Sequence, residues 1–384
     1  ILAVSGVTAN YENETSTFGV FLYELVNHQW EQIGDPIESL PNVFNYHGIA
    51  TNLSADGSVL AIGAPWSDEY LGNESGYVKI YSNQNGNISQ IGEIFGGTKL
   101  VQHEGFVVKQ ADELGWSLAL SGDGSTLIVG IPGNQEAKIY KFVDNSFIQL
   151  GDEINLESDI TSTNYISVDI SSDGNFIIVG NPSFNSNNGQ IKVFQFNNDE
   201  WQQIGADING SDLNYFGDSV QISSDGKTIA ASSINIGSSG FTQVYKLNNG
   251  TWDLYKQEPI NSNDHLYNGK SLSLSDNGEI LAIGSSSNFL KNSENIAPSA
   301  GSGFSAGYIG YEEDPGNVTV YDIFDQESDV QQSGGLQSDD LVSEIELISD
   351  SYLFTDKASL DAAISHWIDN ETTAAVVYGD INTW

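Results

Sequence analysis

Few residues in this 384-residue sequence have the types and spacing that catalysis requires. The five histidines lie too far apart for the short spacings of a zinc site. No Gly-x-Ser-x-Gly elbow stands between a strand and a helix, and the string GSGFSAG at 301–307 predicts a flexible loop. The absence of cysteine excludes disulfides, thiolate metal sites and cysteine nucleophiles. Neighbouring carboxylates such as those at 312–314 are expected by chance among 52 acidic residues, so we predict no catalytic residues, no metal, no cofactor and no enzymatic activity.

Aromatic residues indicate ligand binding rather than catalysis. Trp66 and Tyr70 lie in the string WSDEYLGNESG, outside the alternating pattern of the segments around it and beside Asp68 and Glu69. Such rings could stack on a sugar, and anchoring of the loop is the alternative. By contrast, the tryptophans at 30, 201 and 252 recur at one position of a repeat, which predicts packing in the core.

The charge of the chain limits its partners. Twelve basic residues against 52 acidic residues give a net charge of −40. Proteins bind nucleic acids by neutralising phosphates with Lys and Arg, so we exclude nucleic acid as a partner. The sequence has no apolar run long enough to span a membrane, and we predict no membrane insertion.

An internal repeat organises most of the chain. One string recurs as LSADGSVLAIGAP from Leu53, LSGDGSTLIVGIP from Leu120, ISSDGNFIIVGNP from Ile170, ISSDGKTIAASS from Ile222 and LSDNGEILAIGSS from Leu274. A second string, such as GQIKVFQFNNDEWQQIG from Gly189, follows each of the first four. Apolar alternation within both strings predicts four strands per unit, and the Asp-Gly pair predicts a type I′ hairpin between the first two.

Tandem four-stranded units of about fifty residues are typical of a β-propeller blade. We therefore predict an all-β fold, a β-propeller of four-stranded antiparallel blades over residues 1–323, with a sandwich or solenoid as the alternative. Six blades are visible and seven are possible. The first begins at its second strand, Ile1–Gly6, and the last lacks a clear fourth strand. Either Ser343–Ser349 (SEIELIS) closes the ring against the first blade, or a seventh blade lies upstream of Ile1.

Two strings resemble a known repeat. Gly115–Leu118 (GWSL) and Phe216–Val220 (FGDSV) each lead into an Asp-Gly hairpin. They resemble the FG-GAP repeats of integrin-α-type propellers over about residues 1–325, which implies an adhesive, ligand-binding or spacer role. Calcium-binding members carry several Asp or Asn side chains in the loop. Here the turn offers a single Asp, too few oxygens for calcium, so we interpret these residues as turn formers.

The C-terminal part differs in composition. Residues 324–341 are acidic and polar and predict a linker, and residues 342–384 predict a closing strand or the start of a second surface module, with a short helix at 357–368. The string from Phe354 to Trp384 resembles the leader of a surface-protein family with leucine-rich-like repeats. That resemblance implies a piece of a larger extracellular protein.

Long loops on a rigid scaffold are where binding tends to reside. The insertions 97–114 and 286–316 emerge on the face that also carries the loops between second and third strands. We predict a contact surface on this face, made of Trp66, Asp68, Tyr70, Phe106, Phe289, Tyr308 and Tyr311. Asn-x-Ser/Thr sequences, candidates for N-glycosylation, begin at Asn13, Asn52, Asn73, Asn87, Asn209, Asn249, Asn317 and Asn370.

Together these patterns predict a secreted, cell-surface glycoprotein with a structural or adhesive role. The expected partner is another protein or a second copy of the chain. A lectin that binds surface glycans is the alternative, and a glycan hydrolase or lyase is a more distant one.

Overall fold

The computed structural model describes most of the chain up to residue 322. The described residues are 1–10, 15–27, 29–39, 47–67, 75–103, 106–156, 165–211, 215–234, 240–255, 260–261, 268–285 and 317–322. The predicted linker at 324–341, the segment 342–384 and the predicted helix at 357–368 lie outside them.

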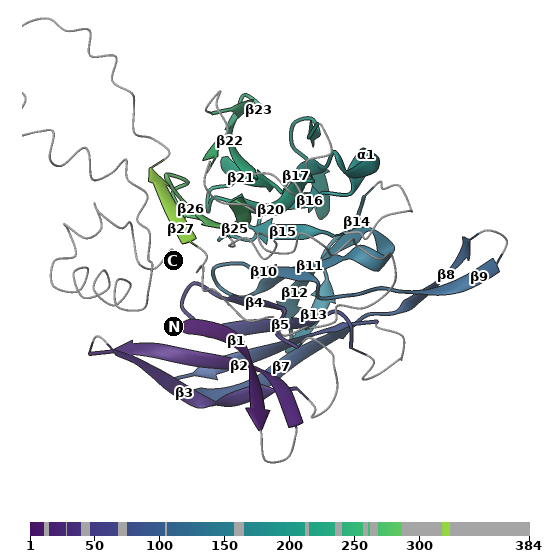
Figure 1. Cartoon of the computed structure of the whole chain (residues 1–384). Helices are drawn as coiled ribbons and strands as arrows, with labels where there is room; N and C mark the ends of the chain where they lie inside the picture. The colour runs from purple at the N-terminus through teal and green to yellow at the C-terminus, as the bar shows by residue number, and fades with distance from the viewer. Residues whose placement is uncertain are drawn as a thin grey trace, which may run out of the picture.

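Within these residues, six antiparallel sheets follow one another along the chain, and we name them blades A to F (Figure 1). Blade A holds β1 (Leu2–Asn10), β2 (Thr15–Val26) and β3 (Gln29–Glu38); blade B holds β4 (Ala50–Leu53), β5 (Val59–Ala64), β6 (Tyr77–Gln84) and β7 (Asn87–Phe95). Blade C holds β10 (Ser117–Leu120), β11 (Thr126–Ile131), β12 (Glu136–Val143) and β13 (Ser146–Gln149); blade D holds β15 (Ser167–Ile170), β16 (Phe176–Asn181), β17 (Gln190–Asn197) and β18 (Glu200–Gln203). Blade E holds β20 (Phe216–Ile222), β21 (Thr228–Ser233), β22 (Phe241–Asn248) and β23 (Thr251–Leu254); blade F holds β25 (Asn268–Leu274), β26 (Ile280–Ser285) and β27 (Asn317–Asp322).

The sheets of blades C, D and E each have a short fifth strand that pairs with the third strand: β14 (Ile154–Asn155), β19 (Ile208–Asn209) and β24 (Ile260–Asn261). The remaining elements are β8 (Thr98–His103), β9 (Phe106–Ala111), the 3₁₀ turn η1 (Pro132–Asn134) and the four-residue α1 (Phe184–Asn187). Two residues inside α1 have left-handed backbone angles, so α1 is a turn and not a regular helix.

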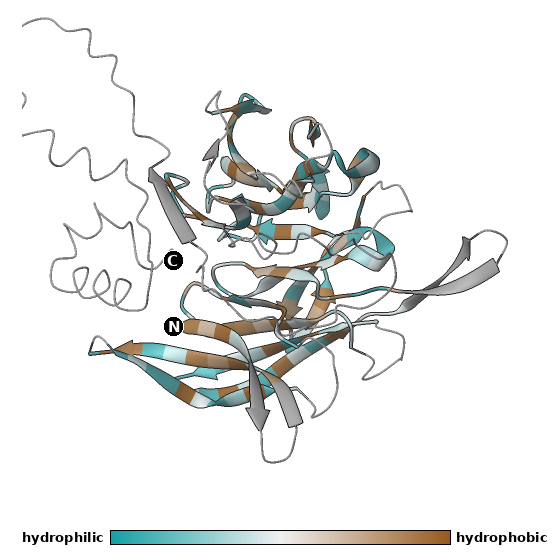
Figure 2. Ribbon diagram, in the orientation of Figure 1, coloured by the Kyte–Doolittle hydropathy of each residue, from teal (hydrophilic) through white to brown (hydrophobic). Residues whose placement is uncertain are grey.

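The first strands of neighbouring blades pack side by side, in the order β4, β10, β15, β20 and β25. The second strands are the most buried: Leu60, Leu127 and Ile177 are each 0% exposed. Hydrophobic residues accordingly concentrate along the strands, and hydrophilic residues mark many of the turns (Figure 2). Stacked four-stranded sheets with adjacent inner strands are the architecture of a β-propeller, which confirms the predicted fold class.

The recurring outer-strand aromatics fasten one blade to the next. Trp201 of β18 donates its Nε1–H to the Leu150 carbonyl of blade C at 2.9 Å, and Trp252 of β23 repeats this bond to Ile204 of blade D at 3.0 Å. Gly205 lies under the Trp252 indole, where a Cβ would come within 2.8 Å of the ring. Trp201 and Trp252 are part of the packing between blades, as their periodicity predicted. The prediction was wrong for Trp30 of β3, which is 40% exposed, because the described residues of blade F include no outer strand for it to pack against.

The hairpins between first and second strands differ from the predicted type I′ turn. A type I′ turn needs positive φ at both central residues. In each of these hairpins only the glycine of the Asp-Gly or Asn-Gly pair has a positive φ, for example 72° at Gly174. The Gly174 amide donates to the Ser171 carbonyl at 2.9 Å, and Ser171 Oγ donates to Asp173 Oδ1 at 2.6 Å. The serine two residues before the Asp of each turn, here Ser171, therefore favours a type I turn followed by a left-handed glycine.

The predicted loop at 97–114 is also corrected. It contains the two-stranded hairpin β8–β9, which extends away from the blades (Figure 1). The apolar runs Leu100–Val101 and Phe106–Val108 contain β-branched and aromatic residues, which favour strands.

Candidate functional site

Three aromatic residues, at strand ends of the three successive blades B, C and D, meet on the loop-bearing face. We call Trp66, Trp116 and Tyr165 the aromatic cluster. The ring centroids of Trp66 and Trp116 are 5.3 Å apart with the planes at 70°, an edge-to-face contact. Those of Trp116 and Tyr165 are 5.0 Å apart at 45°. All three side chains are only partly buried.

Each ring is positioned by the end of a strand. Trp66 follows β5 in a turn closed by the Ser67 amide, which donates to the Ala64 carbonyl at 3.2 Å. Trp116 directly precedes β10, and Tyr165 stands two residues before β15.

One serine holds the last two rings together. Ser117 Oγ, next to Trp116, donates to the carbonyl of Ile166, next to Tyr165, at 2.7 Å. Gly115, with φ of 93°, lets β10 approach blade B, since a Cβ there would lie 2.6 Å from the Tyr77 carbonyl oxygen. The cluster is thus built on rigid elements.

The inner strands carry a second set of polar side chains, which link blades. The Leu120 amide donates to Asn52 Oδ1 at 2.9 Å, and the Ile222 amide donates to Asp169 Oδ2 at 2.8 Å. The Leu274 amide donates to Gln221 Oε1 at 3.4 Å. Burial raises the pKa of Asp169 to about 7, although hydrogen bonds from backbone amides act against this shift.

The other perturbed groups lie apart from the cluster. Burial raises the pKa of Asp218, and the Lys270 ammonium, 3.4 Å from Asp218 Oδ2, acts against this shift. His47 is buried, its Nδ1 lies 2.9 Å from the Tyr77 hydroxyl, and burial together with the charge of Lys79 lowers its pKa to about 4. His47 is therefore neutral at physiological pH, a structural histidine at the junction of blades A and B.

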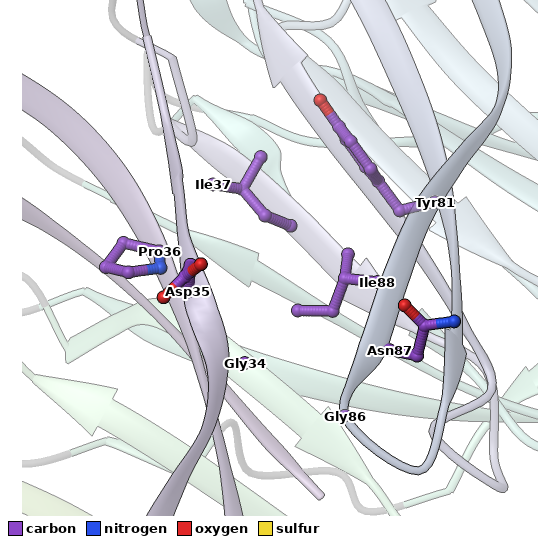
Figure 3. A pocket seen from close by; sticks show the side chains of 8 residues that line it. All are labelled: Gly34, Asp35, Pro36, Ile37, Tyr81, Gly86, Asn87 and Ile88. Atoms are coloured by element: carbon purple, nitrogen blue, oxygen red, sulfur yellow. The ribbon is translucent and has the colours of Figure 1, made fainter.

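A cleft of about 380 Å³ lies between blades A and B on the outer side of the molecule. Ile37 of β3 and Ile88 of β7 point toward each other across it, and Tyr81 of β6 points to its upper end (Figure 3). Asp35 is its one carboxylate among the lining residues. The cleft therefore lacks the paired acids or the nucleophile and base of a hydrolytic site.

Of the seven residues of the predicted contact surface, the structure describes only Trp66 and Phe106. Trp66 lies on the loop-bearing face as predicted. Phe106 begins β9, the second strand of the extended hairpin. Asp68, Tyr70, Phe289, Tyr308 and Tyr311 lie outside the described residues.

Trp116 and Tyr165 were not among the predicted contact residues. Their signal in the sequence is an aromatic residue one or two positions before the serine that opens a first strand.

The glycosylation candidates fall into different environments. Asn87 is exposed at the start of β7, Asn249 is exposed in a hairpin turn, and Asn209 is exposed on β19. Asn52 is set aside as a candidate, because its partly buried side chain binds the Leu120 amide between two inner strands. Asn317 begins β27. Asn13, Asn73 and Asn370 lie outside the described residues.

Among the described side chains, no three His, Asp or Glu residues gather closely enough to hold a metal ion. In the hairpin turns the Asp oxygens accept bonds from neighbouring hydroxyl and amide groups, as in Asp123, which Ser121 Oγ and the Ser125 amide contact at 2.7 and 2.9 Å. No helix within the described ranges is long and apolar enough to cross a membrane.

Solved structures share the fold. A protein from Lactobacillus plantarum is 10% identical and aligns over 87% of this chain and 81% of its own, with a TM-score of 0.51. The chain has a β-propeller fold. TolB from Acinetobacter baumannii is 13% identical over 84% of this chain, with a TM-score of 0.40, and hydrazine synthase from Kuenenia stuttgartiensis is 17% identical over 73%, with a TM-score of 0.45. This propeller spans 61% of the TolB chain and 64% of the hydrazine synthase chain.

Sequence comparison adds no family. No family model matches the chain, and no curated protein matches it. The likenesses to FG-GAP repeats and to the leucine-rich-like surface family therefore stay resemblances of the sequence.

The comparisons correct the prediction that the chain is not an enzyme. A putative 6-phosphogluconolactonase from Bacteroides uniformis is 14% identical over 73% of this propeller and 88% of its own chain, with a TM-score of 0.41. A periplasmic gluconolactonase from Pseudomonas aeruginosa is also similar, at 13% identity and a TM-score of 0.35. The prediction was wrong as an exclusion, because it rested on missing linear motifs. Loops of separate blades meet on one face of a propeller, so catalytic groups can converge there without such a motif. These likenesses show no substrate for this chain.

Proposed function

We propose that this propeller is an extracellular recognition module that binds a partner protein at its loop-bearing face, through the aromatic cluster. The observation that carries the proposal is the contact of Trp66, Trp116 and Tyr165, three partly exposed rings on rigid strand ends. Tryptophan and tyrosine are enriched among the residues that contribute most of the binding energy at protein interfaces.

The geometry of the rings favours a protein over a sugar. A sugar ring stacks on a flat, open aromatic face. Trp116 is contacted by two rings that are tilted against its plane, Trp66 at 70° and Tyr165 at 45°, so the cluster offers an uneven apolar surface. A protein side chain can fill such a surface. The net charge of −40 further favours a partner whose rim is basic, because like charges repel at close approach.

A glycan ligand is the second candidate, because the cluster is partly exposed and Trp66 leads into the acidic string that begins at Asp68. The secreted, adhesive and glycosylated character of the protein belongs to the same proposal. It is supported by the FG-GAP resemblance, by the surface-family resemblance after Phe354 and by the exposed sequons at Asn87 and Asn249.

Binding of the fluorescently labelled protein to the surface of its source cells tests this function. We expect saturable binding that protease treatment of the cells abolishes and that Trp116→Ala weakens at least about tenfold, the loss expected for a central interface tryptophan. Ile148→Ala is the matched control, because Ile148 is an apolar side chain, 52% exposed, on the outer strand β13. Wild-type affinity of Trp116→Ala would contradict the proposal. Loss of binding after glycosidase treatment alone would favour the glycan.

A further inference from the structure

Blade A has no inner strand among the described residues. Its order is β1–β2–β3, and β1 has the register of a second strand: Leu2 faces Tyr23 as Leu60 of blade B faces Tyr81. In blades B to F the second strand pairs on its inner side with a first strand, as Leu53 pairs with Leu60. The inner edge of β1 is the corresponding position.

The apolar side chains of β1 are exposed where those of other blades are buried. Leu2 is 37% exposed and Val4 is 41% exposed, whereas their counterparts in blade B, Leu60 and Ile62, are each 0% exposed. Ile1, just before β1, is 44% exposed. Figure 2 shows the strand at the N-terminus as hydrophobic over its first residues. Exposed apolar residues on an open strand edge require a cover.

A groove of about 670 Å³ runs along this edge. Its walls come from three strands and their turns: Ile1–Ala3 of blade A, Thr51–Ala55 of blade B, and Ser273–Asn277 with Ile280 of blade F. The groove thus lies where an inner strand between β25 and β4 would complete the order of inner strands.

Two series of hydrogen bonds lead to this groove from either side. In the inner turns, the Ala55 amide donates to the Gly122 carbonyl, the Gly122 amide to Ser172, and the Ser224 amide to Asp276. In the inner strands, Asn52, Asp169 and Gln221 accept from the amide of the next blade. The amide that corresponds to those of Leu120, Ile222 and Leu274 in blade B is the amide of Leu53, a residue that lines the groove.

We propose that residues Ser343–Ser349 of this same chain occupy the groove as the inner strand of blade A. Ile345, Glu346 and Leu347 repeat the apolar–polar–apolar order of Val168-Asp169-Ile170. Glu346 then takes the position of Asp169 and accepts from the Leu53 amide. In this register Ile345 faces Val4 and Leu347 faces Leu2, which covers both exposed side chains.

The chain is long enough to reach this place. Twenty residues separate Asp322, the last residue of β27, from Ser343. Extended, they span up to roughly 66 Å, well beyond the width of one blade. Blade F and β1 line the same groove, so the path from β27 is short.

Cysteine cross-linking in the full chain tests the register, and the natural absence of cysteine removes competing pairs. We expect the double variant Val4→Cys with Ile345→Cys to form an intramolecular disulfide under mild oxidation, seen as a loss of two hydrogens in intact mass without a dimer. The off-register pair Val4→Cys with Glu346→Cys should form it at least about tenfold more slowly, because successive side chains of a strand point to opposite faces. Equal rates for the two pairs, absence of the disulfide, or disulfide-linked dimers alone would overturn the proposal, the last by showing a strand from a second copy.

Stability gives a second readout. Leu347→Asp should lower the thermal midpoint of the full chain by several degrees, whereas Leu341→Asp, in the polar segment before the proposed strand, should leave it unchanged. Equal midpoints for the two variants would contradict the proposal even if the disulfide forms.

Discussion

The ring of Trp116 meets the ring of Tyr165 at a centroid distance of 5.0 Å, although the two residues introduce the inner strands of different blades. Ser117 bonds to the Ile166 carbonyl beside them, so the contact belongs to the junction of blades C and D. The exposed surface of the aromatic cluster and the packing of the propeller are therefore coupled.

This coupling predicts a measurable interaction energy between Trp116 and Tyr165. In a double-mutant cycle with Trp116→Ala and Tyr165→Ala, urea unfolding should give a favourable coupling of about 0.5–1.5 kcal/mol. Pairing Trp116→Ala with Tyr255→Ala, a tyrosine of blade E, is the control and should give additive effects. Additivity for Trp116 and Tyr165 would show that the rings touch without stabilising the junction.

We predict that the buried Asp169 carboxyl group makes the stability of the protein fall as pH rises. Burial raises its pKa to about 7 in the folded protein, above the ordinary value of 3.8. Between these values the folded state binds more protons than the unfolded state, so its stabilising effect is complete at low pH and is lost as pH approaches 7. The unfolding free energy of Asp169→Asn minus that of the wild type should therefore increase by about 2 kcal/mol from pH 5.5 to pH 8.

Asp173→Asn is the control for that measurement. Hydrogen bonds from Ser171 and Asn175 lower the pKa of Asp173 despite the opposing effect of burial. The same substitution there should lower stability at pH 8 or leave it unchanged. If Asp169→Asn shows no dependence on pH over this range, the Asp169 carboxylate is not held in a desolvated site.

Substitutions at Gly205 and Gly250 separate the effect of close packing on stability from the effect of backbone conformation. Both have positive φ, 71° and 82°. A Cβ at Gly205 would lie 2.8 Å from the Trp252 ring, whereas a Cβ at Gly250 would meet nothing within 4 Å. Gly205→Ala should therefore destabilise the protein by about 1–3 kcal/mol more than Gly250→Ala in urea unfolding, because it also displaces the indole between blades D and E. Equal losses would mean that backbone strain alone accounts for both.

The repeat predicts the sheets and their order, because apolar alternation and the Ser-x-Asp-Gly turn are local signals. It does not predict the turn type, because the hydrogen bond from Ser171 Oγ to the Asp173 carboxylate favours a type I turn. The strands of the hairpin β8–β9 alternate weakly and their pairing depends on contacts within the insertion, so they were taken for a loop.

The aromatic cluster depends on spatial proximity. Trp66 is marked by its place outside the strand pattern. Trp116 and Tyr165 lie 49 residues apart, and only the stacking of blades C and D brings their rings together. Residues beyond 322 are not part of the described structure, and the sequence-based predictions for them stay predictions.

Hydroxyl-radical footprinting tests the role of the loop-bearing face most directly, by comparing the isolated protein with the protein bound at the surface of its source cells. The account predicts that oxidation of Trp66, Trp116 and Tyr165 falls severalfold on binding, while oxidation of Ile148 on the outer edge is unchanged. Protection of Ile148 with unchanged oxidation of the aromatic cluster would contradict it and place the contact on the outer strands of the blades.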